Sequence, residues 1–354
     1  MKKTPLYEKH LELKAKMIEF GGWEMPLQYS SILEEHLSVR NNVGMFDISH
    51  MGEIEIYGDK AKESILRLTP VHEKKLIPGK ASYSFLLNEK GGIIDDLIIY
   101  TFSSERFILV VNAGNLEKDL NWIKEQVYPK TEVKNLSDDI SALSIQGPAS
   151  EEIFKILFRS DLSDLKYYSF EKDLRYNNVE FLFVSRTGYT GELGFEIYAR
   201  PEEILKLWDI LLRLNVKPCG LGARDGLRLE AGMPLYGHEL NENITPLEAN
   251  LERFVDIERS FIGREALIQR EREKHLIGFK MLDKGVPREG QKIFILKNKE
   301  EVGYVTSGGY SPCLNEYIGM GYVKLYDKET ELGIDIRDKI KRAVITALPF
   351  YKRR

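Results

Sequence analysis

The pattern of the chain changes near residue 273, and this change restricts the fold more than any other feature of the sequence. Before it, runs with helical periodicity alternate with short strand-like runs. Between Gly263 and His275, basic and acidic residues alternate, and short apolar runs with Gly and Pro turns follow, without a convincing helix. Such repeated short strands are typical of a small β-barrel or sandwich. We therefore predict an α+β region over residues 1–273 and an all-β domain over residues 274–354.

Two helix starts can be placed near the N-terminus. Thr4 followed by Pro5 is a favourable start, because a capping side chain stands before a proline in the first turn. Ser31 and Glu34 have the spacing of a capping box, in which each side chain binds a backbone amide of the other residue. We expect the second helix to run to about Arg40.

Composition and charge exclude several classes of protein. Lys and Arg number 51 against 55 Asp and Glu, so the chain has no electrostatic footprint for nucleic acid. The two cysteines, Cys219 and Cys313, lie far apart, and the six histidines show no ligand spacing, so we expect neither a metal site nor a disulfide. The first residues lack a signal or transit pattern, and no apolar run approaches the roughly 20 residues of a membrane span. We expect a cytoplasmic protein that does not bind membranes.

Two adjacent carboxylates lie in an otherwise apolar run, residues 93–102, which we expect to form a hairpin with residues 82–87. Successive side chains of a strand point to opposite faces, so Asp95 and Asp96 face different sides. Both sides are apolar, and a buried ionised carboxylate is costly unless it is paired or hydrogen-bonded. A structural Asp bound by backbone amides and a functional acid explain this pattern about equally well.

A second carboxylate in apolar surroundings is Glu196, which stands between bulky residues of a predicted strand. The glycine-rich stretch just before it, residues 186–194, carries the aromatic Tyr189. Tight backbone with one large planar side chain can frame a flat ligand. A plain hairpin looks much the same, and it is the more frequent explanation of such a stretch.

Two arginines, Arg224 and Arg228, are four residues apart in a stretch that begins with two glycines. In a helix they lie on one face, where like charges repel unless an anion is near. Asp225 or Glu230 can supply that anion, and this is the slightly more frequent case. The glycines also leave room for the carboxylate of a ligand. The residues alone therefore suggest a site for a carboxylate-bearing ligand, without metal or nucleotide, and they do not name the ligand.

Several longer segments carry a resemblance that spans nearly the whole chain. They are Thr4–Tyr7, Phe20–Tyr29, Val43–Gly52, Gly91–Leu97, Ile145–Pro148, Arg186–Glu192, Leu235–Glu239 and Leu348–Arg353. In these segments the chain resembles the glycine cleavage T-protein family, the aminomethyltransferases. The resemblance implies a cloverleaf, with two interwoven α+β lobes within residues 1–273 and a C-terminal β-barrel-like domain over residues 274–354.

The resemblance also implies a folate pocket, with residues carried over position by position. Asp96 matches the essential acid of the family, and Glu196 matches the carboxylate that binds the pterin. A carboxylate suits that role because it accepts hydrogen bonds from two neighbouring N–H groups. The other implied pocket residues are Met51, Tyr83, Asn112, Tyr189, Arg224, Arg228, Tyr236 and Tyr351.

The implied reaction moves one carbon without a metal. The lipoyl-carrying H-protein of the glycine cleavage system presents an aminomethyl group, ammonia leaves, and tetrahydrofolate, as co-substrate, becomes 5,10-methylenetetrahydrofolate. In that reaction Asp96 orients the folate nitrogens and stabilises developing positive charge or manages a proton. The enzyme acts mainly by holding its two partners together.

Two other classes of this fold are alternatives. Non-catalytic folate-binding relatives carry a Lys-Gly-Cys-Tyr-x-Gly-Gln-Glu signature, whereas the comparable segment here, residues 260–265, has no cysteine. Folate-dependent demethylases are usually fused to a flavin domain, and this chain has no nucleotide-binding glycine fingerprint. Free-standing demethylases of this fold stay an alternative at this point.

Overall fold

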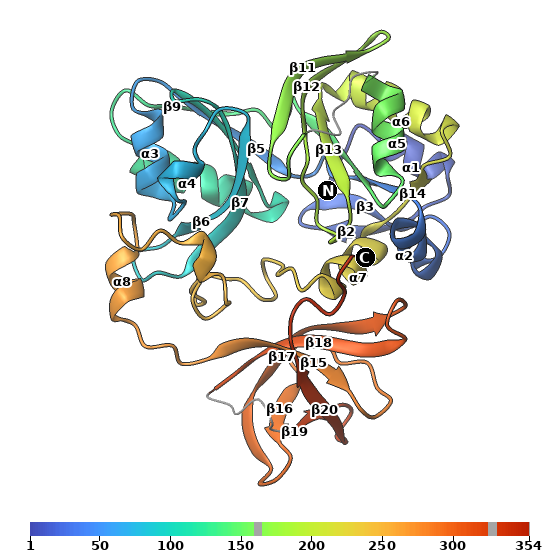
Figure 1. Cartoon of the computed structure of the whole chain (residues 1–354), viewed down its shortest axis with the longest axis vertical. Helices are drawn as coiled ribbons and strands as arrows, with labels where there is room; N and C mark the ends of the chain where they lie inside the picture. Colours follow the sequence, from blue (N-terminus) through green and yellow to red (C-terminus); the bar gives the residue numbers. More distant parts are fainter. Residues whose placement is uncertain (159–164, 325–330, 354) are drawn as a thin grey trace.

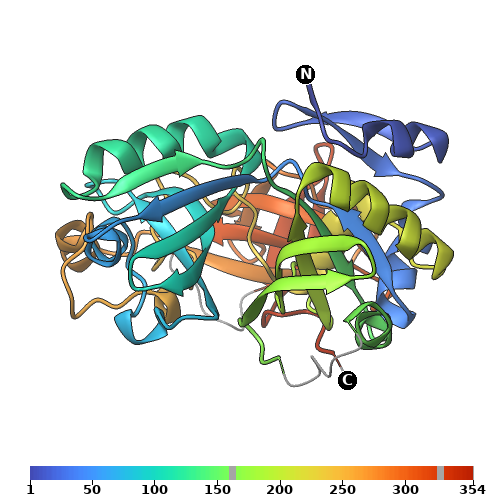
Figure 2. The ribbon, with the colours of Figure 1, turned by 90° about the horizontal axis from the view of Figure 1, so that it is seen from above.

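The computed structural model describes residues 1–158, 165–324 and 331–353. Figure 1 shows three bodies arranged as a cloverleaf: one lobe around strand β7 (Ile93–Ser103), a second around strand β13 (Gly194–Ala199), and a C-terminal barrel below them. From above, the two lobes lie side by side with the barrel beneath (Figure 2). This arrangement and the α+β class confirm the prediction from the sequence.

The first lobe is a sheet with helices on one face. In spatial order its strands are β6 (Lys80–Leu87), β7, β8 (Arg106–Val111), β5 (Gly52–Tyr57) and β9 (Glu132–Asn135). Helices α3 (Ala61–Leu68) and α4 (Leu116–Gln126) cover an apolar core that includes Ile65 and Leu97. The predicted hairpin of β6 and β7 is confirmed, and Asn88 closes its turn by accepting hydrogen bonds from two backbone amides.

The second lobe repeats this plan with a different sheet. In spatial order its strands are β11 (Phe170–Tyr176), β12 (Val179–Ser185), β13, β10 (Ser141–Gln146), β4 (Gly44–Asp47) and β14 (Lys217–Pro218). Helices α5 (Ser150–Phe158) and α6 (Pro201–Arg213) pack over a core that includes Phe154 and Trp208. Because β4 precedes the whole first lobe in the sequence and β10 follows it, the two lobes are interwoven.

The N-terminal segment adds a small sheet of β1 (Lys2–Lys3), β3 (Trp23–Gln28) and β2 (Lys16–Phe20), with helices α1 (Tyr7–Glu12) and α2 (Ile32–Asn41). At α2 the Ser31 half of the predicted capping box is confirmed, since the Ser31 side chain accepts a hydrogen bond from the Glu34 amide at 3.2 Å. At α1 the predicted cap is wrong. Thr4 donates its hydroxyl hydrogen to buried Asp47 at 2.7 Å, because tying the segment to β4 satisfies a buried carboxylate.

The C-terminal domain is a closed barrel, as predicted. Its strands, in order around the barrel, are β15 (His275–Met281), β18 (Glu316–Val323), β17 (Glu300–Ser311), β16 (Lys292–Ile295), β19 (Glu331–Asp335) and β20 (Ile340–Thr346). Helix α7 (Leu221–Glu230) contacts the barrel, and α8 (Arg264–Gln269) leads to it. Arg354 lies outside the described residues. The short 3-10 turns are η1 (Glu73–Lys75), η2 (Ala113–Asn115) and η4 (Glu252–Phe254).

An aromatic core joins the two sheets. Tyr100 of β7 packs on Phe183 of β12 and Tyr198 of β13, with ring centroids 4.8 and 5.6 Å apart. This core fixes the two lobes against each other, so side chains further along β7 and β13 meet at a defined separation. Among the described residues, no helix is long and apolar enough to cross a membrane.

Candidate active site

Asp96 lies on β7 in a partly exposed position between two hydrogen-bond donors. The Tyr83 hydroxyl donates to Oδ2 at 2.8 Å, and the Asn112 side-chain amide donates to Oδ1 at 2.9 Å. Burial, followed by the charge of neighbouring Asp95, raises the pKa of Asp96 to about 7. The donors favour the anion and the burial opposes it, so this carboxyl is poised to change its proton near neutral pH.

Asp95 faces the opposite side of the strand and is fully buried. It accepts hydrogen bonds from the Asn112 amide and side chain, at 2.9 and 2.8 Å, and from the Asn115 side chain at 2.6 Å. The alternation inferred from the sequence therefore separates the two acids as expected. Asp95 is held by donors at the end of β8 and in η2, as the structural reading of the pattern requires.

Glu196 lies on β13, where its backbone pairs with Ser144 on one side and Ser185 on the other. Thr187 donates its hydroxyl hydrogen to Glu196 Oε2 at 2.5 Å. Burial raises the pKa of Glu196, and the Thr187 bond and the nearby charge of Arg224 oppose that rise. The carboxylate thus sits in a dry environment with few partners of its own, which suits an acceptor for a ligand.

The glycine-rich loop before β13 is shaped by close packing against Gln146. A Cβ on Gly188 or Gly194 would clash with the end of the Gln146 side chain, so a larger residue at either position would displace that side chain. Thr190 donates to Gln146 Oε1 at 2.9 Å, and Tyr189 donates to a backbone carbonyl at 2.5 Å. The loop is therefore a built support that fixes the Tyr189 ring.

Arg224 joins this group from α7. Its guanidinium lies over the Tyr189 ring, 5.0 Å from the centroid. The guanidinium also interacts electrostatically with the Glu196 carboxylate. Its Nη1 atom is buried and has no hydrogen-bond partner among the described residues. Burial lowers the pKa of Arg224, and Glu196 opposes this. A buried donor without a partner is costly, so a ligand acceptor at this position would remove the cost.

Arg228 lies four residues further along the same helix, in different surroundings. It is 1% exposed, and its guanidinium donates to Glu239 and to Ser307 of the barrel at 2.8 Å, and to Asp225 at 2.8 Å. From the sequence, one alternative is that a neighbouring acid of the same helix neutralises the arginines. The structure shows this for Arg228, which is paired with Asp225. Its donors are used within the chain, and they tie α7 to the barrel.

Three further predicted residues lie around these groups. Met51 packs against the core between the lobes, and Tyr236 lies in the cluster that contains Tyr83, with its hydroxyl bound by Lys118 at 2.9 Å. The guanidinium carbon of Arg40 lies over the Tyr351 ring, 4.0 Å from the centroid of that ring. Tyr351 is thus placed by its contact with α2.

The two lobes bring the central groups together. The charge of Asp96 helps to raise the pKa of Tyr189, which comes from the second lobe. Tyr189 in turn helps to raise the pKa of Tyr83. The structure thus gathers Asp96, Tyr83 and Asn112 from one sheet and Tyr189 and Glu196 from the other. Two hollows of about 350 and 560 Å³ lie elsewhere and include none of these residues.

Sequence reasoning missed several residues beside this site. Tyr168 helps to raise the pKa of Tyr83, and the charge of Glu196 helps to raise the pKa of Tyr168. Its φ of 55° is a left-handed conformation that is strained for a bulky residue. His50 is buried with an unpartnered Nδ1, and burial lowers its pKa to about 4. A signal for His50 existed, since it lies in one of the segments that carry the family resemblance; Tyr168 had none.

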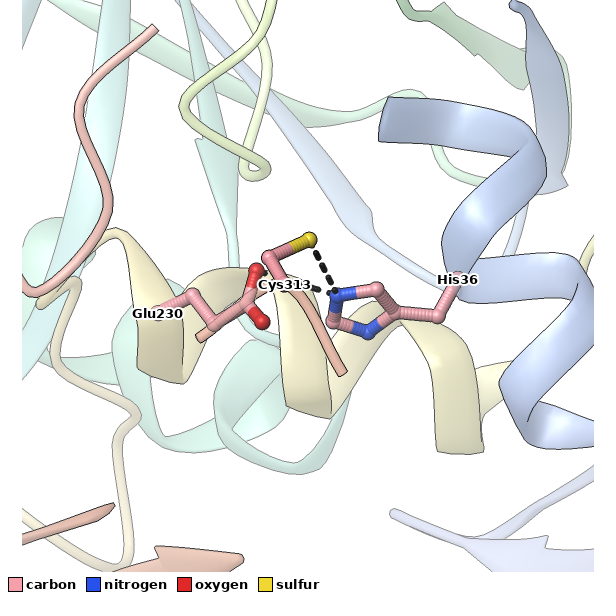
Figure 3. A group of neighbouring side chains, drawn as sticks. All are labelled: His36, Glu230 and Cys313. Atoms are coloured by element: carbon pink, nitrogen blue, oxygen red, sulfur yellow. Dashed lines mark hydrogen bonds and ion pairs between the residues drawn. The ribbon is translucent and has the colours of Figure 1, made fainter. Parts of the chain in front are cut away.

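Among the described residues, one group has the atoms for a metal: His36, Glu230 and Cys313, drawn in Figure 3. The His36 ring nitrogen lies 3.0 Å from Glu230 and 3.8 Å from the Cys313 sulfur. Arg40 also binds Glu230, at 2.9 Å, and its charge opposes a cation at this place. The group is better described as a buried ion-pair network, in which the pKa of Glu230 is lowered to about 2 because His36 and Arg40 oppose the effect of burial.

Comparison with known proteins gives the family. The pattern described as "GCVT N-terminal domain" matches residues 6–259, and that of "Glycine cleavage T-protein C-terminal barrel domain" matches residues 274–352. An aminomethyltransferase of Geobacillus sp. strain WCH70 is 44% identical, covering 100% of this chain and 99% of its own. One from Thermosipho melanesiensis is 45% identical, covering 99% and 98%.

A solved structure agrees with these sequence matches. The crystal structure of the glycine cleavage system aminomethyltransferase T from Bartonella henselae has a TM-score of 0.92 and 34% identity, covering 100% of this chain and 99% of its own. Both domains therefore match one family, and the sequence relatives and the solved structure match over the whole length of the chain. The chain belongs to the glycine cleavage T-protein family, and both of these sequence relatives are aminomethyltransferases.

Proposed function

We propose that this chain transfers the methylene of an aminomethyl-dihydrolipoyl carrier, the H-protein of the glycine cleavage system, to tetrahydrofolate, releasing ammonia and forming 5,10-methylenetetrahydrofolate. The observation that carries the proposal is the meeting of Asp96, a carboxyl with a pKa near 7, with Tyr189 and Glu196 across the two lobes. The proposal assigns folate binding to residues 1–273 and the barrel domain to residues 274–354.

Glu196 is the proposed acceptor for the pterin. Its carboxylate accepts hydrogen bonds from the hydroxyls of Thr187 and Tyr198, and lone pairs are left for the adjacent N3–H and 2-amino groups of the ring. Tyr189 would lie beside the pterin, and Arg224 behind that tyrosine would use its unpartnered Nη1 on a pterin acceptor. This assignment explains two costly features of the site, a buried acid and a buried free donor, by one ligand.

Asp96 is the proposed group at the reacting end, with Tyr83, Asn112 and Met51 lining the pocket around it. An ionised Asp96 stabilises positive charge on the methylene carbon and the folate nitrogens, and it can take up a proton that they release. Arg228, Tyr236 and Tyr351 stay predicted members of the site at its edge.

The proposed chemistry balances without an oxidant or reductant. Folate N5 forms a bond to the carrier methylene carbon, N10 forms the second bond, and the carbon–nitrogen and carbon–sulfur bonds of the aminomethyl sulfide break. The two protons lost by N5 and N10 go to the departing amine, which becomes ammonia, and to the lipoyl thiolate. The protein holds the two reactants in the right positions and supplies one group that can take up a proton. Holding two reactants together in this way can lower the reaction barrier substantially.

The test uses the purified protein, tetrahydrofolate and an aminomethylated lipoyl carrier protein, with ammonia and methylenetetrahydrofolate measured together. Equal amounts of both products, dependent on all three components, support the proposal. Methylenetetrahydrofolate formed from an N-methyl amine and an oxidant, and not from the carrier, would assign the chain to the demethylases. Folate binding without either product would make it a binding protein.

A further inference from the structure

Asp119 is a buried acid outside the proposed contacts with substrate. It lies on α4 and is fully buried, and neither carboxylate oxygen accepts a hydrogen bond from an N–H or hydroxyl donor among the described residues. The adjacent ammonium of Lys118 is used elsewhere. It donates to the Ile94 carbonyl at 2.8 Å, to Tyr236 at 2.9 Å and to Glu242 at 3.2 Å. An ionised Asp119 would therefore be a buried charge without a donor, which is costly.

The side chain of Asp119 interacts with that of Asp95, which is itself an acceptor. Burial raises the pKa of Asp95, and the three hydrogen bonds that it accepts from Asn112 and Asn115 oppose this rise and favour its ionised form. Two carboxyl groups in contact and without a common donor are satisfied only when one of them is protonated. Burial and then the charge of Asp95 raise the pKa of Asp119 to about 10, so Asp119 is the group that keeps the proton.

A continuous path leads from this pair to Asp96. The Asn112 side-chain amide lies 2.8 Å from Asp95 Oδ1 and 2.9 Å from Asp96 Oδ1, so one NH₂ group binds both acids. The Asn112 backbone amide is held by the other oxygen of Asp95. As long as Asp95 is an anion, Asn112 must turn its NH₂ group, and not its oxygen, toward Asp96.

We propose that Asp119 is a positioning residue for Asp96: a neutral carboxylic acid that donates to Asp95 and keeps Asp95 as the anion that orients Asn112. The expected effect on turnover rests on the proposed function, whereas the protonated state of Asp119 is independent of it. The charged and titratable groups that act on Asp119 are Asp95, Asp96 and Lys118.

The first experiment needs no substrate. Carboxyl carbons of aspartate are labelled with ¹³C, and their signals are followed by NMR from pH 5 to pH 9 in the wild type and in Asp119→Asn. We expect one aspartate signal of the wild type to stay that of a protonated acid throughout, and to vanish in Asp119→Asn. A wild type in which all aspartates are ionised at pH 9 would overturn the proposal.

The second experiment separates the hydrogen bond from the fold. Asp119→Asn keeps a donor toward Asp95, and Asp119→Leu keeps the volume and removes the donor. We expect Asp119→Asn to keep wild-type kcat and pH profile. In Asp119→Leu, Asp95 loses a donor and takes up a proton itself. The repulsion by Asp95 then disappears, and because it affects the pKa of Asp96 more than the Asn112 bond does, that pKa falls even if Asn112 turns away. The Asp96 signal and the pH profile of kcat both shift to lower pH.

We also expect kcat of Asp119→Leu to fall tenfold or more, the order of a lost hydrogen bond to a charged group, with a smaller change in KM for folate. Glu117→Leu, an exposed acid on the same helix, is the matched control and should equal the wild type. An unshifted Asp96 signal in Asp119→Leu, or a shift as large in Asp119→Asn, would refute the positioning role. If the NMR results hold and no methylenetetrahydrofolate is formed by the wild type, the proposed function fails alone.

Discussion

Tyr83 donates its hydroxyl hydrogen to Asp96 Oδ2 at 2.8 Å, across the pair of strands β6 and β7. This bond favours the ionised form of Asp96, and it opposes the burial that raises the pKa of Asp96 to about 7. Because the proposed role requires the carboxylate, activity should rise with pH through about 7.

Tyr83→Phe tests this relationship. The variant removes a donor to the anion, so the pKa of Asp96 rises further, and the pH profile of kcat should move to higher pH. Profiles of the wild type and the variant, recorded at saturating carrier and folate, measure the shift. Tyr304→Phe, in the barrel, is a control that should leave the profile in place. A shift to lower pH in Tyr83→Phe would contradict the assignment.

The two adjacent acids should separate activity from stability. Asp96→Asn should lower kcat by about a hundredfold to ten-thousandfold, the range for losing a general acid–base group, without lowering the melting temperature. Asp95→Asn should destabilise the fold by about 1.5–3 kcal/mol, because it places an amide among three donors, and its effect on turnover should be milder. Urea unfolding measures the stability of both variants, and steady-state kinetics measure their kcat. If both variants are as active as the wild type, Asp96 takes no part in the chemistry.

Glu196→Gln should weaken tetrahydrofolate binding and spare the fold. The amide keeps the shape of the side chain but turns a donor toward the pterin, so the expected loss is about 1.5–3 kcal/mol of binding free energy. The Thr187 hydroxyl can donate to the amide oxygen of Gln as it does to the carboxylate, and burial already disfavours the charge of Glu196, so the folded chain should lose little stability. Calorimetric titration with tetrahydrofolate measures the loss, with the exposed acid of β12, Glu180→Gln, as control. Unchanged folate affinity would make Glu196 structural.

Arg224→Ala should weaken folate binding by the same factor whether or not the ligand carries a glutamate tail. The reason is position: Arg224 lies against Tyr189 and near Glu196, at the end that we assign to the pterin. Titrations with pteroate-type and glutamylated ligands make the comparison. A loss confined to glutamylated ligands would place Arg224 at the tail instead, as a carboxylate-binding arginine.

Arg228→Met should act on stability. Arg228 is buried against Glu239, and removing one partner of a buried ion pair costs about 3–5 kcal/mol, because the other charge is left unpaired. Arg200→Met, which removes an exposed arginine with surface partners, should cost less than about 1 kcal/mol. Denaturant unfolding of the two variants gives the difference. Similar values for both would show that Arg228 does not hold the barrel to α7.

Local patterns in the sequence predicted much of this structure. The opposite orientation of Asp95 and Asp96 follows from the two-residue period of a strand, and the start of α2 follows from the Ser31 cap. The relationship of Asp119 to Asp95 could not be predicted, since it depends on how α4 packs on the sheet. The different surroundings of Arg224 and Arg228 depend in the same way on the barrel, which lies far along the chain. Which residues touch Asp96 or Glu196 is thus decided by packing between elements, and the roles that the family resemblance implies for them stay predictions.

The interwoven lobes have a consequence for synthesis on the ribosome. The sheet that carries Asp96 uses strands within residues 52–135 only, so all of its strand pairs can form once that stretch has emerged. The sheet that carries Glu196 needs β4, made early, together with β10 to β14, which end at residue 218. Strand β4 must therefore wait, unpaired, while about a hundred residues are added, a delay of roughly 5–20 s at common elongation rates. During this interval the nascent chain exposes an apolar strand, and the first lobe is complete before the second can close.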